Sequence, residues 1–500
     1  MKKPHSSPPT KPTLRDVATT PSLLRTEVLA GLVVALALIP EAISFSIIAG
    51  VDPRVGLFAS FTMAVSIAFL GGRPAMISAA TGAVALVVAP VVKEHGLDYL
   101  FATVILAGLI QIALALLGAA KLMRFIPRSV MIGFVNALAI LIFVAQLPHV
   151  RELNWTVYAM IAVGLAIIVL LPRVTTAVPA PLVAIAVLTG YVLISGADVP
   201  NVRDEGALPH TMPKPLIPDL PLTWHTLSII GPYALAMALV GLLESHLTAK
   251  LVDDVTDTPS NKTREAWGQG GSNIISGFFG GLGGCAMIGQ TMINVKTSGA
   301  RTRLSTFLAG VFLLALVLGA GRLVEQIPMA ALVAVMTMVA VGTMDWHSIS
   351  PRTLRRMPLA ETSVMLITVI TVVATDNLAI GVVLGTLTAM VMFARRVAHL
   401  TEVTRTIEHD DDGEYVNYLV QGQLFFASSN DLYMQFAYSE DPARVVIDLS
   451  RSHVWDASTV AALDSITAKY ERLDRSVRIT GLNDSSAERH QLLTGHLATH

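Results

Sequence analysis

Two carboxylic acids lie inside stretches of sequence that otherwise carry almost no charge. Between Leu29 and Val51 the only charged residue is Glu41, and Glu244 lies in a second apolar stretch. A charged side chain in a bilayer costs about 2.5–3.5 kcal/mol or more, so such residues usually face a polar cavity and have a function. Because a desolvated carboxyl group can cross a membrane in its neutral, protonated form, both acids are candidates for proton coupling. The alternative is a structural hydrogen bond to a neighbouring helix.

A short phrase occurs twice, and each copy interrupts a hydrophobic region with glycine. Residues 71–78 read Gly-Gly-Arg-Pro-Ala-Met-Ile-Ser, and residues 280–289 read Gly-Gly-Leu-Gly-Gly-Cys-Ala-Met-Ile-Gly. Each copy predicts an extended Ala-Met-Ile triplet followed by a short helix. Interrupted segments at corresponding places in two halves of a membrane protein indicate a transporter's binding site. The alternative is that the glycines only permit close helix packing.

The two short helices would bring their amino ends together near the middle of the membrane. Free N–H groups and the positive end of the helix dipole make such ends attractive for an anion. Small side chains would let the anion approach the backbone, while hydroxyl and amide groups would add hydrogen bonds. The predicted substrate-binding residues of the two first turns are Ser78, Ala79, Ala80 and Thr81, and Gly289, Gln290 and Thr291.

The composition places most of the chain in a membrane. Of 500 residues, 53% are hydrophobic and 14% are charged, whereas a soluble protein carries about 25% charge. A helix needs about 20 apolar residues to cross a bilayer. A net charge of −1 and the lack of a basic stripe give no sign of nucleic-acid binding, and a single cysteine excludes an internal disulfide framework. The polar, proline-rich start of the chain does not predict a cleavable signal peptide.

Fourteen spans fit the pattern of hydrophobic runs and basic loops. Most basic loop residues fall on one side of the membrane, which predicts cytoplasmic N- and C-termini in the inner membrane of a bacterium. The loop at 195–222 then lies outside and joins two halves of seven spans; because seven is odd, the second half is inverted. The predicted spans are 25–49, 54–71, 79–92, 98–119, 125–147, 155–171, 179–195, 228–250, 264–281, 289–299, 303–321, 328–342, 360–375 and 378–394.

The segment at 257–305 carries the most specific motifs. It contains Arg264-Glu265, Gln269-Gly270, Asn273 and the tail Gly299–Ser305, and matching patterns occur at Ile39–Ala42, Val55–Ser60 and Ile77-Ser78. In this combination the chain resembles the SulP family of anion transporters, the relatives of the sulfate permeases, over roughly residues 25–495.

The resemblance implies an α-helical membrane fold of fourteen segments in a seven-plus-seven inverted repeat, like that of uracil permeases. Spans 1–4 and 8–11 would form a substrate-carrying core that moves, as in an elevator, against a gate of spans 5–7 and 12–14. It also implies a homodimer. The predicted domains are a cytoplasmic segment at 1–24, the transport domain at 25–397, and a linker with a cytoplasmic domain at 398–500.

The chain departs from the family pattern in the tenth span. Many animal members have an arginine where this chain has Gln290, which disfavours a chloride–bicarbonate exchanger or channel. Bicarbonate importers of the family use sodium and an aspartate in the eighth span. Glu244 in that neighbourhood fits a proton better than sodium. No cofactor and no metal is expected.

After Arg396 the composition becomes that of a soluble domain. Glu408–Asp412 predicts an acidic linker, and alternating apolar runs around 415–426, 445–450 and 477–480 predict strands. This part resembles a STAS domain, which is shared with anti-sigma-factor antagonists and suggests a regulatory role or a cytoplasmic protein partner. Ser458 falls near the phosphorylated serine of the antagonists, but it is equally placed to cap a helix that starts near Thr459.

Three functions compete. The leading one is proton-coupled symport of a small anion, with a C4-dicarboxylate such as fumarate as the first candidate and sulfate as the second. A nucleobase carrier of the same fold is the next, although the STAS-like domain and the 257–305 motif count against it. The third is a membrane-anchored scaffold for signalling, for which buried acids and paired half-helices would serve no purpose. None of the three is an enzyme.

Overall fold

The computed structural model describes residues 14–118, 126–150, 155–175, 179–221, 223–375, 377–398, 401–411 and 413–494. The chain divides into two compact units, Met1–Thr386 and Leu387–His500. The first unit is helical, and the second has a four-stranded sheet. The division falls inside one long helix, α17 (Leu378–Ala398).

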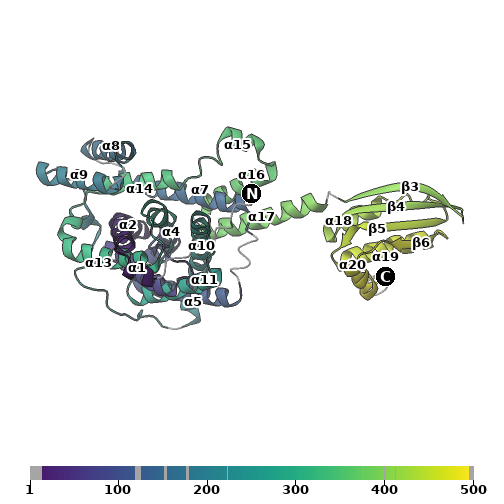
Figure 1. Ribbon diagram of the computed structural model, residues 1–500, viewed down its shortest axis with the longest axis horizontal. Helices are drawn as coiled ribbons and strands as arrows, with labels where there is room; N and C mark the ends of the chain where they lie inside the picture. Colours follow the sequence, from purple (N-terminus) through teal and green to yellow (C-terminus); the bar gives the residue numbers. More distant parts are fainter. Residues whose placement is uncertain are drawn as a thin grey trace, which may run out of the picture. The chain divides into compact units, whose positions relative to one another are not determined.

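The first half of the helical unit contains seven predicted spans. A short helix, α1 (Leu14–Thr19), precedes them. The third span consists of a strand and a half-helix rather than one continuous rod. The elements are α2 (Pro21–Ala49), α3 (Pro53–Leu70), β1 (Ser78–Ala79) with α4 (Gly82–His95), α5 (Leu97–Leu116), α7 (Arg128–Val144), α8 (Trp155–Leu170) and α9 (Ala180–Ser195) (Figure 1).

The second half repeats this order of elements. Its third member is again a short strand and a short helix, and that helix continues without a break into a π-helical turn. The elements are α10 (Trp224–Thr256), α11 (Lys262–Phe278), β2 (Cys285–Ala286) with α12 (Ile288–Met292) and η5 (Ile293–Thr297), α13 (Arg303–Glu325), α14 (Met329–Thr343), α15 (Pro351–Arg356), α16 (Leu359–Thr375) and α17. The described residues therefore contain a helical segment at each of the fourteen predicted spans.

Length and composition support the membrane assignment. Within the described ranges, seven helices are long and apolar enough to cross a membrane, and four shorter helices are also apolar. The remaining segments are the two half-helices and α11, which is rich in glycine and polar residues. Glycine is poor in an isolated helix, but it permits close packing in a membrane. The α11 glycines do this: Gly270 and Gly277 lie directly against the backbone of α5.

Each packing contact between the two halves has a counterpart in which the equivalent helices of the halves change places. Helix α11 packs on α5, and its counterpart α3 packs on α13; likewise α2 packs on α13, and α10 packs on α5. Such an exchange is what a two-fold axis relating inverted repeats produces. A separate group of contacts joins α7, α8, α9, α14 and α16, which lie beside the α2–α4–α10 group (Figure 1). These features confirm the predicted fold class.

The second unit is a small α/β domain. The strands β3 (Glu402–Asp410), β4 (Gly413–Leu424), β5 (Arg444–Val454) and β6 (Ser476–Thr480) form a sheet in that order, antiparallel between β3 and β4 and parallel thereafter. Helices α18 (Phe426–Met434), α19 (Ala457–Glu471) and α20 (Asp484–Leu493) complete it. Its own hydrophobic core includes Tyr418, Ile447 and Leu463.

The prediction of an acidic linker at 408–412 is wrong. Glu408 lies in β3, which pairs with β4 from Glu402↔Gln421 to Asp410↔Gly413. The Tyr415 hydroxyl and the Asn417 amide donate to the Glu408 carboxylate at 2.5 and 3.2 Å. These hydrogen bonds lower the pKa of Glu408, so the acidic side chain is held on the hairpin. These partners follow Glu408 by only seven and nine residues, but composition does not show which residues face one another across a hairpin.

Candidate anion site at the paired half-helices

The two interrupted segments meet as a pair of short antiparallel strands. Ser78 lies opposite Ala286, and Ala79 lies opposite Cys285. The Met287 N–H also donates to the Ile77 carbonyl at 2.9 Å. A Cβ on Gly284 would lie only 1.9 Å from the Ala79 carbonyl oxygen. Glycine therefore allows the two backbones to approach here, and this contact brings the half-helices from opposite halves of the chain together.

The predicted equivalence of the two Ala-Met-Ile triplets is wrong in register. Ala75 lies in a turn with φ +60, and β1 begins only at Ser78, after the triplet. In the second copy, Ala286 is already the last residue of β2. What repeats in space is a strand followed by a helix. The pairing depends on where the backbones can approach, which the repeated letters do not encode.

The α4 helix consequently starts later than predicted. Its first residue is Gly82, and Thr81 is the N-cap, whose hydroxyl accepts from the Val84 N–H at 3.3 Å. Ser78 and Ala79 are strand residues rather than first-turn residues. Ala80 lies between the strand and the cap, and its N–H donates to the Ser60 hydroxyl at 3.3 Å.

Ser78 makes a bond on the side of the strand that faces α11. Its buried hydroxyl accepts from Gln269 Nε2 at 2.7 Å. The Thr81 hydroxyl lies 3.2 Å from Cys285 Sγ, across the strand pair. Both hydroxyls, which the sequence predicts to bind a ligand, thus have hydrogen-bonding partners within the protein.

On the other side, the three predicted residues do lie in the first turn of α12. Gly289 is exposed, and a Cβ there would meet nothing within 4 Å. Gln290 Nε2 donates to Glu41 Oε1. The Thr291 hydroxyl accepts from the Ile77 N–H at 3.0 Å, which fastens α12 to the segment before β1. The backbone at Gly289 is therefore open enough for a small anion to reach it, next to the Gln290 amide that is bonded to Glu41.

Both predicted acids are brought to these half-helices. Glu41 and Glu244 are each 8% exposed, although they come from α2 and α10, more than 200 residues apart in the sequence. Glu41 accepts from Gln290 of α12, and Glu244 Oε2 accepts from Cys285 Sγ at 2.9 Å. Both acids therefore make the hydrogen bond that the structural alternative expects, and both contact residues of the two interrupted segments.

Sequence reasoning missed two residues of this region. Cys285 was considered only for disulfides, yet it touches both Glu244 and Thr81; its place inside the second phrase, directly before the Ala-Met-Ile triplet, was the available signal. Glu265 was part of a motif without a role. It is fully buried and accepts from the backbone N–H groups of Gly72 and Arg73 at 2.7 and 3.0 Å. It therefore anchors the segment that leads into β1.

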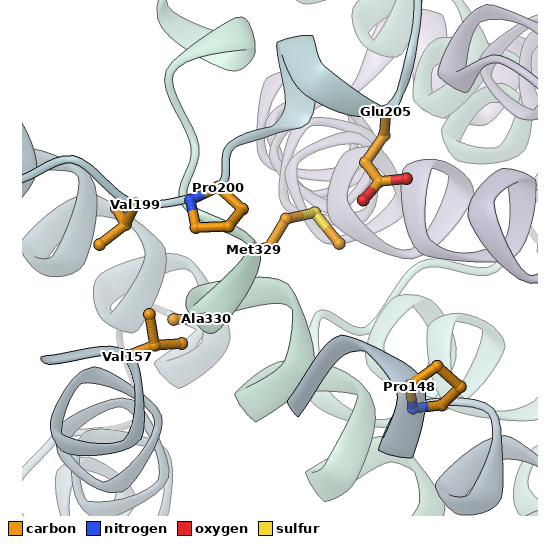
Figure 2. Close-up of a pocket in the computed structure, with 7 residues that line it drawn as sticks. All are labelled: Pro148, Val157, Val199, Pro200, Glu205, Met329 and Ala330. Carbon is orange, nitrogen blue, oxygen red and sulfur yellow. The ribbon is translucent and has the colours of Figure 1, made fainter. Parts of the chain in front are cut away.

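A small cavity lies away from this region, between α8, α14 and the segment that follows α9. It has a volume of about 150 Å³. Its walls are apolar except for Glu205, whose carboxylate lies near Met329 (Figure 2). None of the seven predicted binding residues lines it. The lining residues are Pro148, Val157, Val199, Pro200, Glu205, Met329 and Ala330.

In the second unit, the helix cap is not Ser458. Asp456 is the N-cap of α19, where its carboxylate accepts from the Thr459 N–H at 3.1 Å. The same carboxylate accepts from the Phe426 N–H at 2.6 Å and so ties α18 to α19. Ser458 is exposed as the second residue of the helix, so the capping alternative for this serine is wrong.

Family comparisons agree with the fold and the motifs. The model of the sulfate permease family matches residues 24–163 and 149–368, and the STAS domain model matches residues 406–495. The chain belongs to the sulfate permease family. This confirms the resemblance drawn from the motifs and makes the chain a multi-pass anion transporter with a C-terminal STAS domain.

Individual relatives span nearly the whole chain. YbaR of Bacillus subtilis, to which sulfate transport is ascribed, is 54% identical over 463 residues, or 93% of this chain and 95% of YbaR. The bicarbonate transporter BicA of a Picosynechococcus species is 25% identical, covering 92% and 88% of the two chains.

Solved structures share the fold of this family member. The transmembrane domain of a cyanobacterial BicA matches with a TM-score of 0.62 and 26% identity, over 73% of this chain and 97% of that one. Murine Slc26a9, an anion transporter solved in the inward-facing state, matches with a TM-score of 0.81 and 15% identity, over 98% and 92%. The second likeness concerns the fold alone.

Proposed function

We propose that this transporter carries a small anion together with a proton. The observation that supports it is the placement of Glu41 and Glu244, two buried carboxyl groups that are hydrogen-bonded to residues of the α12 and β2 segments. An anion near an ionised carboxylate is repelled, whereas a protonated carboxyl group removes that repulsion. Proton and anion would thus bind together more favourably than either alone.

The anion would lie between the amino ends of α4 and α12. Backbone N–H groups and the helix dipoles would supply the attraction, and the Gln290 amide and the Thr81 hydroxyl would supply directional hydrogen bonds. Gly289, with open space over its Cα, leaves room for approach to the backbone. In this scheme Ser78, Ala79 and Ala80 shape the site from β1, and Thr291 holds α12 in place.

The substrate we propose is a small dianion. A divalent oxyanion or dicarboxylate can interact with two opposed helix ends at once. The sulfate transport ascribed to YbaR supports sulfate, while fumarate remains the dicarboxylate that the sequence favoured. Bicarbonate, the substrate in the name of BicA, is the control for a monovalent ion, and sodium is the control for a different coupling ion.

Transport into proteoliposomes with an imposed pH gradient tests the proposal. Radiolabelled sulfate or fumarate should accumulate when the outside is acidic, and an unlabelled competitor should show which of the two binds better. Sodium in place of the pH gradient should not drive uptake. Accumulation of uracil instead would favour the nucleobase alternative, and no accumulation of any solute would favour the scaffold.

Glu244→Gln is the decisive variant. It should abolish uptake driven by the pH gradient while leaving exchange of labelled for unlabelled anion intact, because the amide imitates the protonated acid. Glu41→Gln tests the second acid in the same way. Glu361→Gln changes an exposed acid in the first turn of α16 and should behave like the unaltered protein. An unchanged pH dependence in Glu244→Gln would reject the coupling role.

The remaining assignments concern assembly and orientation. We propose a homodimer in the bacterial inner membrane, with both termini and the STAS domain in the cytoplasm. Cross-linking in native membranes and protease access from either side of inverted vesicles test these two points. We also propose that the STAS domain binds a cytoplasmic protein, with the exposed Ser458 as the candidate regulatory site; phosphoprotein analysis of the purified transporter tests the latter.

A further inference from the structure

Cys285 lies between the buried acid of α10 and the cap of the opposing half-helix. The thiol is completely buried. Its sulfur lies 2.9 Å from Glu244 Oε2 on one side and 3.2 Å from Thr81 Oγ1 on the other. Thr81 in turn accepts from the Val84 N–H at the start of α4. Three side chains thus form a continuous chain of hydrogen bonds from Glu244 to the α4 N-cap.

The direction of these hydrogen bonds depends on the protonation state of Glu244. An ionised carboxylate only accepts, so the Cys285 S–H must point to it, and the sulfur can then accept from the Thr81 O–H. A protonated carboxyl group can donate to the sulfur instead. The S–H is then free to donate to Thr81 Oγ1, and the Thr81 hydrogen is released from the sulfur. No covalent bond is made or broken in this rearrangement.

We propose that Cys285 is a positioning residue that transmits the protonation state of Glu244 to the Thr81 hydroxyl. When Glu244 is protonated, Thr81 can donate its hydrogen to an anion at the amino end of α4; when Glu244 is ionised, that hydrogen is held by the sulfur. Proton binding therefore favours anion binding beyond the removal of charge repulsion. This inference rests on the proposed proton-coupled function.

The surroundings of Glu244 leave Cys285 as the group that can perform this role. Among the described residues, Cys285 is the titratable side chain with a hydrogen bond to the Glu244 carboxylate. His246, two residues further along α10, bonds the Leu242 carbonyl at 2.7 Å, and Glu41 of α2 accepts from Gln290. Apart from Tyr233 of α10, which precedes Glu244 by eleven residues, the other charged or titratable residues on α10 and on the elements packed against it lie toward helix ends: His225, Lys250, Asp253 and Asp254 of α10, Lys93, Glu94 and His95 of α4, Asp98 and Tyr99 of α5, and Lys262, Arg264 and Glu265 of α11.

Two substitutions at Cys285 separate the relay from simple packing. Cys285→Ser keeps a group that both donates and accepts, and Cys285→Ala removes it. Equilibrium binding of radiolabelled sulfate to the purified full-length protein is measured from pH 5 to 8. We expect Cys285→Ser to keep the pH dependence of affinity. Cys285→Ala should match the unaltered protein at low pH, where the Thr81 hydrogen is already free, and should bind about tenfold more tightly at high pH, because no sulfur then withholds one hydrogen bond to a charged group.

The S–H stretching band in the infrared provides a second measurement on the unaltered protein. Cys285 is the only cysteine of the chain, so the band has one source. It should shift with pH as the acceptor changes from a carboxylate to a hydroxyl, with the same midpoint as sulfate affinity. This measurement remains available if Cys285→Ala does not fold.

The outcomes distinguish this inference from the proposed function. If the unaltered protein binds sulfate or fumarate equally at all pH values, the proton-coupled function itself fails. If binding depends on pH but Cys285→Ala retains that dependence in full, or the S–H band stays constant across it, Cys285 is not the relay and the coupled function stands.

Discussion

Gly284→Ala should disrupt the crossing of the two strands on which the whole site depends. The added Cβ would lie 1.9 Å from the Ala79 carbonyl oxygen, 2.6 Å from its carbon and 3.1 Å from the Ala80 nitrogen. Ordinary contact begins near 3.4 Å, so one strand must move by about 1.5 Å. All three neighbours are backbone atoms, which cannot turn aside as a side chain could.

The expected cost is at the upper end for overpacking, about 3 kcal/mol. Gly284 is also held from both sides, because its N–H donates to Asn273 Oδ1 at 2.9 Å and its carbonyl accepts from Asn273 Nδ2 at 3.1 Å. A displaced β2 would lose these bonds as well as the pairing with β1. The midpoint of thermal unfolding in detergent should fall by roughly 5 °C.

Gly289→Ala is the matched control five residues later. A Cβ there meets nothing within 4 Å, and alanine is favoured over glycine in a helix by about 0.5–1 kcal/mol. Its thermal stability should be unchanged or slightly higher, but sulfate affinity should fall, because the methyl group occupies the space through which we propose the anion approaches. Equal stability of the two variants would refute the close crossing, and unchanged affinity in Gly289→Ala would refute the approach.

Two further predictions concern the STAS domain. The Asp441 carboxylate is buried and accepts from the hydroxyls of Tyr418 and Tyr470 at 2.7 and 2.5 Å. Asp441→Ala should lower the domain's free energy of unfolding by about 3 kcal/mol, because two hydrogen bonds to a charged group are lost. Urea denaturation of residues 401–494 measures this, and a loss below about 1 kcal/mol would contradict the role of this network. Ser458→Asp places a negative charge in the first turn of α19 and should raise stability by about 0.3–1 kcal/mol; the same assay would show a decrease if the helix did not begin at Ala457.

Several elements followed directly from the sequence because their causes are local. Hydrophobic runs and the basic loops between them located the fourteen spans, since each span must meet the thickness of the bilayer with its own residues. The breaks at residues 71–78 and 280–289 were visible because glycine and a shortened apolar run interrupt a helix wherever they occur. Glu41 and Glu244 were recognised because an isolated acid is conspicuous in an apolar segment.

The errors fell where two backbone segments pair. The Ala-Met-Ile repeat predicted that the strand would begin at the same place relative to the triplet in both copies. In the first copy the strand begins four residues later, relative to the triplet, than in the second copy. The acidic segment at 408–412 was expected to be a linker, but its residues Glu408–Asp410 pair with β4, while Asp412 lies outside the described residues. Strand pairing is decided by close approach between segments, and neither periodicity nor composition records which backbones approach.

The sequence by itself determined that this chain spans a membrane many times in two inverted halves, that each half is interrupted once, and that a soluble STAS domain follows. Only the tertiary structure decided that Glu244 meets Cys285, that Cys285 meets Thr81 across 204 residues of sequence, and that Gln290 meets Glu41. The physical reason is that membrane insertion is governed by the hydrophobicity of each segment alone, whereas a hydrogen bond between buried side chains requires two packed segments to meet at one register.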